Sequence, residues 1–187
     1  MKIGKRMQNK GRGIAMKNNK GMSLIEIIIV IAILAILTTG ALGGMNYIRY
    51  GNAKSCAYEI NAALDKVRME AMSKAEKPYL YIYQFNGSYY MMQSTAVASA
   101  SLLNASGTRL GNQQLILSYE TTHPASEDIS RYEDGKYMAI SFDKTKGGIS
   151  TNPSDSCYYK KILIKDSDGT VRYTITLIRA TGKHYVE

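Results

Sequence analysis

The stretch Lys20-Gly21-Met22-Ser23-Leu24-Ile25-Glu26 leads into an apolar run from Ile27 to Leu37, and only small, apolar or weakly polar residues follow as far as Leu42. Glu26 therefore places a carboxylate inside an otherwise clean membrane segment. A charge in hydrocarbon costs ~2.5–3.5 kcal/mol on insertion scales, so we expect Glu26 to pair with another group. Residues 22–42 number 21. At ~1.5 Å rise per residue, a helix of that length crosses a hydrocarbon core of ~30 Å.

The positive charge of the chain is concentrated before this segment. The 187 residues carry a net charge of +9, but residues 1–21 hold seven cations and no acid, which leaves 17 basic against 15 acidic residues in the rest. An argument for nucleic-acid binding from overall charge therefore fails. Because Lys and Arg stay on the cytoplasmic side, the leader predicts a single span with the N-terminus inside and the C-terminus outside. A functional basic arm is the alternative interpretation of these charges.

An ordinary secretory signal peptide competes with the membrane interpretation. Small residues suited to its cleavage site do follow the apolar run, at residues 38–44. Such a signal favours a shorter apolar stretch, however, and it leaves Glu26 unexplained.

The next segment, Met45 to Glu76, changes to helical spacing. Apolar residues recur every three or four positions, with charged residues between them, which indicates an amphipathic helix. The residue before Pro78 disfavours helix, so we predict one long helix from Met22 to Glu76, ~80 Å if continuous, whose second half needs a partner for its apolar stripe. The stripe consists of Ala53, Ala57, Ile60, Leu64, Val67 and Ala71.

After Pro78 the pattern is that of β-strands. Residues 79–85 and 88–93 flank Asn86-Gly87, whose residue types suit a tight hairpin turn. Further strands are predicted at residues 114–121 and 136–142, and a second hairpin at residues 158–165 and 171–179. Polar loops are predicted at residues 94–112, 122–135 and 143–156. The fold class is α+β: a long helix packed against one antiparallel sheet.

No residue pattern predicts a catalytic centre, a cofactor or a metal site, and we expect no enzyme activity. Asp166-Ser167-Asp168-Gly169 lacks the closing glutamate of a calcium loop and is interpreted as a hairpin turn. His123 and His184 lack local ligand partners, and Glu133-Asp134 is interpreted as a solvated pair. Cys56 and Cys157 lie on the outward side, where a disulfide is permitted, with two separate thiols as the alternative.

Two surface features leave alternatives open. Tyr79, Tyr81 and Tyr83 share one face of a strand, which favours cross-strand packing over an adhesive or subunit-contact surface. The cations Arg172, Arg179 and Lys183 near the C-terminus are candidates for contact with DNA phosphates, with a solvated face as the simpler interpretation.

The stretch from Lys20 to Leu37 resembles the class III signal of type IV prepilins and pseudopilins. The resemblance implies that a prepilin peptidase cleaves between Gly21 and Met22 and that the new amine of Met22 is N-methylated. Glu26 then matches the family's carboxylate, which is thought to pair with the terminal amine of a neighbouring subunit. The family usually has phenylalanine where this chain has Met22. Residues 63–72, 138–142 and 181–183 are similar to H-type minor pseudopilins and related minor pilins.

The resemblance implies a minor pilin or pseudopilin that waits in the inner membrane and then enters a type IV pilus-like or type II secretion filament. Its expected partners are the prepilin peptidase, other subunits, the inner-membrane assembly platform and membrane lipid. The expected divisions are a cleaved leader at 1–21, a transmembrane and assembly helix at 22–44, the amphipathic half at 45–77 and a β-rich domain at 78–187. A DNA-uptake or adhesion subunit and a membrane-anchored or secreted enzyme are the alternatives.

Overall fold

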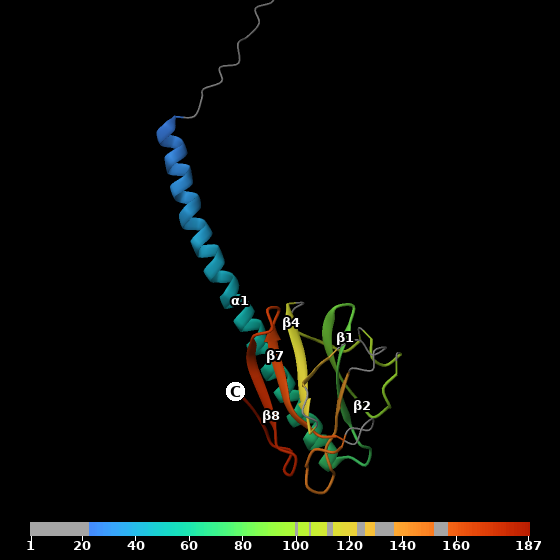
Figure 1. Cartoon of the computed structure of the whole chain (residues 1–187). Coiled ribbons are helices and arrows are strands. Elements are labelled where there is room, and N and C mark those ends of the chain that lie inside the picture. Colours follow the sequence, from blue (N-terminus) through green and yellow to red (C-terminus); the bar gives the residue numbers. More distant parts are fainter. Residues whose placement is uncertain are drawn as a thin grey trace, which may run out of the picture. The chain divides into compact units, whose positions relative to one another are not determined.

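The computed structural model describes residues 23–99, 101–104, 106–111, 114–122, 126–129, 137–151 and 157–187, and within these it describes no side chains for residues 39–46 and 126. The chain divides into two units, one up to residue 42 and the other from residue 43 to residue 187. The second unit contains the C-terminal half of helix α1 together with all the strands, which lie beside that half of the helix in Figure 1.

Helix α1 runs Leu24–Ser73. Its first backbone bonds run from the N–H groups of Glu26 and Ile27 to the carbonyl of Ser23, at 3.0 and 3.2 Å. At the other end the helix stops three residues short of the predicted Glu76. The four residues between Ser73 and Pro78 are non-helical, because a helix cannot run into proline without a clash at the preceding residue.

The predicted stripe on α1 is confirmed as the centre of the core. All six of its residues are buried, and Cys56 joins them. Ala53, Cys56 and Ala57 are small, so the helix backbone approaches the strands closely at this end. Larger side chains, Ile60, Leu64 and Val67, fill the space further along.

The first sheet has four strands in the order β3-β2-β1-β6. The predicted hairpin is confirmed as β1 (Tyr79–Phe85) and β2 (Ser88–Ser94), which pair antiparallel from Tyr79↔Ser94 to Phe85↔Ser88. Its turn has positive φ at both central residues, 48° at Asn86 and 72° at Gly87, as a type I′ turn requires. Short strands β3 (Thr108–Leu110) and β6 (Met138–Ile140) close its two edges.

A second sheet of five strands, where a single sheet was expected, has the order β5-β4-β7-β8-β9. Its centre confirms the predicted strands: β4 (Leu115–Thr121), β7 (Tyr159–Asp166) and β8 (Val171–Leu177). The edges are β5 (Ser126–Asp128) and β9 (His184–Val186), which the sequence did not predict. Apolar side chains from both sheets meet the α1 stripe in one continuous core.

A smaller core lies on the other face of the β1–β2 hairpin. Tyr81 and Tyr83 are buried there with Leu103 and Ala139. The hydroxyl of Tyr83 donates to the carbonyl of Asn104 at 2.6 Å. The interpretation of the tyrosine face as internal packing is therefore confirmed, and the adhesive-surface alternative is wrong for these buried rings.

The turn before β9 approaches another loop closely. Gly182 has φ +64°, and a Cβ built on it would lie 1.8 Å from the carbonyl oxygen of Gly147. Only glycine fits there, because an added methyl group collides with backbone in a conformation that L-residues already disfavour.

We therefore expect Gly182→Ala to lower the free energy of unfolding by about 2–4 kcal/mol, from backbone strain and overpacking together. Gly169→Ala is the matched control, because its φ of +84° is similar but the space around it is open. That control should cost only about 1 kcal/mol. Urea unfolding of both full-length variants in detergent, followed by circular dichroism, measures the difference; equal losses would contradict the proposed clash.

Candidate functional site

The N-terminal end of α1 holds the sequence-predicted assembly residue. Ser23 stands just before the helix and Glu26 lies in its first turn, with the spacing of a capping box, which the sequence analysis missed. Glu26 is exposed. No described cation forms an ion pair with it. Gly21 and Met22 lie outside the described residues.

The helix that follows Glu26 is apolar on every side. All described side chains from Leu24 to Thr38 are exposed, and Leu24 and Ile36 reach 76% and 73%. A helix that is apolar all round belongs in lipid or in the interior of a protein assembly. Within the described side chains, no helix has both the length and the apolar character of a membrane span.

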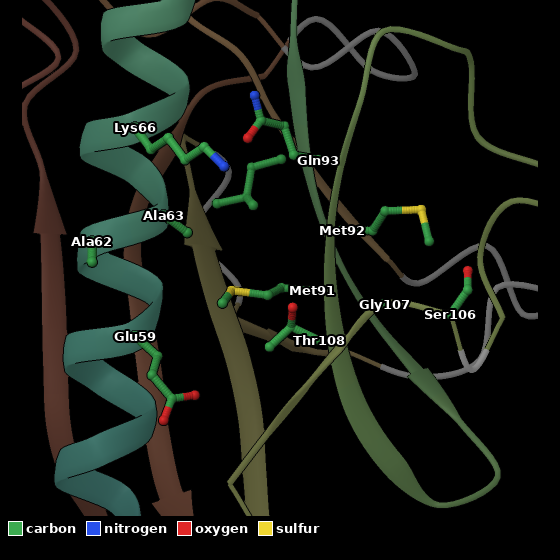
Figure 2. A pocket seen from close by; sticks show the side chains of 11 residues that line it. Glu59, Ala62, Ala63, Lys66, Met91, Met92, Gln93, Ser106, Gly107 and Thr108 are labelled. Atoms are coloured by element: carbon green, nitrogen blue, oxygen red, sulfur yellow. The ribbon is translucent and has the colours of Figure 1, made fainter.

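In the domain that begins at residue 43, a groove runs between α1 and the edge of the first sheet (Figure 2). Its volume is about 460 Å³, within the size range of small-ligand pockets. Ala63 and Met91 face it in Figure 2, and Glu59 and Lys66 stand at two levels of the helix beside it. Alanine and the flexible thioether of methionine leave room for an apolar group.

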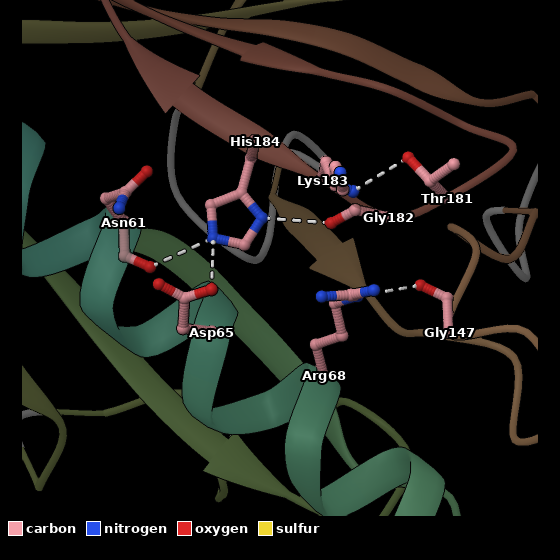
Figure 3. A network of polar contacts seen from close by, with 8 residues as sticks. All are labelled: Asn61, Asp65, Arg68, Gly147, Thr181, Gly182, Lys183 and His184. Carbon is pink, nitrogen blue, oxygen red and sulfur yellow. Dashed lines mark hydrogen bonds and ion pairs between the residues drawn. The ribbon is translucent and has the colours of Figure 1, made fainter.

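A polar cluster fastens the last strand to the helix (Figure 3). The His184 side chain is 1% exposed; its Nε2 lies 3.2 Å from the carbonyl oxygen of Asn61 and 3.2 Å from Oδ1 of Asp65. Its Nδ1 lies 3.0 Å from the carbonyl oxygen of Gly182. Backbone carbonyls only accept, so a ring nitrogen that carries hydrogen is the donor in its contact. Beside it, Arg68 Nε donates to the carbonyl of Gly147 at 3.1 Å.

Comparison with known proteins gives one result, and it falls on the N-terminal segment. Residues 16–42 match the family model described as the prokaryotic N-terminal methylation motif. The chain carries the class III signal of type IV pilins and pseudopilins. No curated protein and no solved structure matches the chain.

This signal implies processing by a prepilin peptidase and assembly with pilins. The α+β architecture, an N-terminal helix packed on antiparallel sheets, agrees with a pilin-like fold. Among the described residues, no cluster of His, Cys, Asp and Glu is arranged to hold a metal ion.

The two cysteines lie near opposite ends of β4. Cys56 and Leu115 both lie within 4 Å of the Cβ position of Gly111, whereas Cys157 precedes Tyr159, which pairs with Thr121. Strand β4 spans about 20 Å between those ends, much more than a disulfide bridges. Both side chains are buried, and neither forms a disulfide in the structure. Burial, helped by the nearby Glu59 carboxylate, raises the pKa of Cys56 to about 12, so the thiol is a poor nucleophile at neutral pH.

Two of the three cations proposed as DNA contacts are engaged within the domain. Arg172 pairs with the buried Asp166 through Nε and Nη2, both at 2.7 Å. The Arg179 guanidinium lies 3.4 Å from the ring centre of Tyr158 and donates to its hydroxyl.

The turn interpretation of residues 166–169 is confirmed, because Gly169 donates to the Asp166 carbonyl at 2.9 Å. The predicted features at His123 and Glu133-Asp134 lie outside the described residues.

We expect His184→Phe to lower the free energy of unfolding by about 2–3 kcal/mol, because an aromatic ring stays in place while the buried hydrogen bonds of the imidazole to Asn61 and Gly182 are lost. Tyr185→Phe is the control. Tyr185 is the next residue in the chain and is 45% exposed, so the change should cost under about 0.5 kcal/mol. Urea unfolding of the full chain in detergent compares the two. An unchanged His184→Phe midpoint would show that the cluster contributes nothing.

Proposed function

We propose that this protein is a minor pilin or pseudopilin subunit that a prepilin peptidase cleaves after Gly21 and methylates at Met22. The mature chain then enters a type IV pilus-like or type II secretion filament. The observation that carries the proposal is the methylation motif at residues 16–42, with glycine at the expected cleavage point and Glu26 four residues beyond Met22.

Before assembly, the subunit crosses the cytoplasmic membrane once, with its N-terminus inside and its β-rich domain outside. Seven cations in residues 1–21 support this orientation. The run of apolar residues 22–42 supplies the length. The exposed apolar side chains of α1, from Leu24 to Leu37, need such a surrounding because water leaves them unpartnered on all sides. Membrane lipid and the assembly platform are the partners at this stage.

In the filament, the Glu26 carboxylate pairs with the amine of Met22 of an adjacent subunit. Glu26 has no described cation beside it. A carboxylate and an ammonium group are each costly in an apolar surrounding, and close pairing offsets much of both costs. The pair therefore favours one position of a subunit relative to its neighbour.

The first test concerns processing. Gly21→Ala places a methyl group at the residue that the peptidase must accommodate, and we expect the variant to keep its 21-residue leader. Intact-mass measurement of the membrane-extracted chain detects this, because the wild type should lack the leader and carry one added methyl group. Gly13→Ala, at another glycine of the leader, should still be cleaved. Cleavage of Gly21→Ala at the wild-type rate would contradict the role of Gly21.

The second test concerns assembly. Glu26→Gln keeps the size of the side chain and removes its charge, so we expect normal cleavage but loss of the subunit from sheared filaments, measured by immunoblot or mass spectrometry. Glu76→Gln is the matched control, because Glu76 is an exposed residue outside the helix. If Glu26→Gln enters filaments as the wild type does, the proposed ion pair has no part in assembly.

A further inference from the structure

Five apolar and aromatic residues remain wholly or partly exposed at one end of the domain. Tyr47, Ile48 and Tyr50 lie on α1, ahead of the first buried stripe residue, and are 82%, 62% and 49% exposed. Val171 and Tyr173 lie at the start of β8; Val171 is 47% exposed and Tyr173 is half-buried. We call these five residues the tyrosine collar.

The helical part and the β8 part of the collar are in contact, although they are far apart in sequence. The rings of Tyr50 and Tyr173 contact each other with centroids 5.4 Å apart and planes inclined at 50°. This contact joins the helix to β8. The neighbouring cation Arg172 is held by Asp166, so it does not cover the rings.

The chain itself restricts where the collar can lie. Only residues 43–46 separate Leu42, the end of the apolar segment, from Tyr47. Even fully extended, that connection keeps Tyr47 within about 18 Å of the segment, and as helix it is about 8 Å long. The headgroup layer on each side of a hydrocarbon core is about 5–8 Å thick. With the connection helical, Tyr47 therefore lies at or just beyond the headgroup layer, and the other collar residues are not placed by the connection itself.

The residue types fit that layer. Tyrosine has an apolar ring and a polar hydroxyl, and it concentrates at membrane–water interfaces for this reason. Arg49, between two of the collar tyrosines in sequence, adds a cation to this end of the helix. Phosphate oxygens are strong acceptors for arginine.

We propose that the tyrosine collar lies in the phospholipid headgroup layer of the membrane that holds the N-terminal segment, and so seats the domain on that membrane before assembly. The proposal rests on the membrane insertion argued above. A second copy of the chain is the competing occupant of the same surface.

The chain contains no tryptophan, so single tryptophans report their own surroundings. Four full-length variants are placed in liposomes of phosphatidylethanolamine and phosphatidylglycerol: Ile33→Trp in the apolar segment, Tyr47→Trp and Tyr173→Trp in the collar, and Tyr185→Trp on β9. Fluorescence is quenched separately by lipids brominated on the acyl chain, by lipids spin-labelled at the headgroup, and by aqueous acrylamide.

We expect acyl bromine to quench Ile33→Trp most strongly. Headgroup labels should quench Tyr47→Trp and Tyr173→Trp more strongly than Tyr185→Trp, with emission shifted to shorter wavelength. Tyr173→Trp decides the proposal, because its sequence position does not tether it to the segment.

Three outcomes are distinguishable from the expected one. If Ile33→Trp is not quenched by acyl bromine, the membrane insertion itself fails, and with it the collar proposal. If Ile33→Trp is quenched but Tyr173→Trp behaves like Tyr185→Trp, only the collar proposal is overturned. If Tyr173→Trp is protected from every quencher, a second copy covers the collar, which also overturns the lipid assignment.

Discussion

The domain depends on the burial of one stripe of α1 against two sheets. Neither sheet has a complete core without it, because buried side chains of β1, β4 and β7 belong to the same core as Ile60, Leu64 and Val67. At roughly 25 cal/mol per Å² of apolar surface removed from water, burial of each large side chain contributes about 1.5–3 kcal/mol. The helix therefore provides the packing surface that both sheets share.

The apolar side chains of the two halves of α1 are kept from water in two different ways. From Ala53 onward, the apolar residues fall on one face and the chain's own strands cover them. Before that, from Leu24 to Leu37, apolar residues point in every direction and remain exposed in the isolated chain. The helix half with one apolar face is covered by strands of the same chain. The half that is apolar all round needs lipid or other protein chains around it.

Much of this arrangement was predictable, and the failures have a common cause. The α1 stripe, the Asn86-Gly87 hairpin and the pairing of β7 with β8 follow from local periodicity and turn chemistry. Strands β3, β5 and β9 have only three residues each, too few to show an alternation of apolar and polar residues. They form because each pairs with the edge of a longer strand. The role of His184 was missed because its partners Asn61 and Asp65 lie more than a hundred residues earlier. Gly182 was missed because its constraint is a contact with Gly147.

The β1–β2 hairpin is enclosed from both sides. Leu80 and Ile82 of β1 point into the core shared with α1, while Tyr81 and Tyr83 point into the smaller core on the opposite face. Residues of adjacent pleats thus belong to separate layers, and β1 also has a hydrogen-bonded strand along each edge. The amides of Leu80 to Ile82, which lie between two paired strands, are consequently well protected from solvent, so deuterium uptake there reports disruption of the domain rather than local fraying.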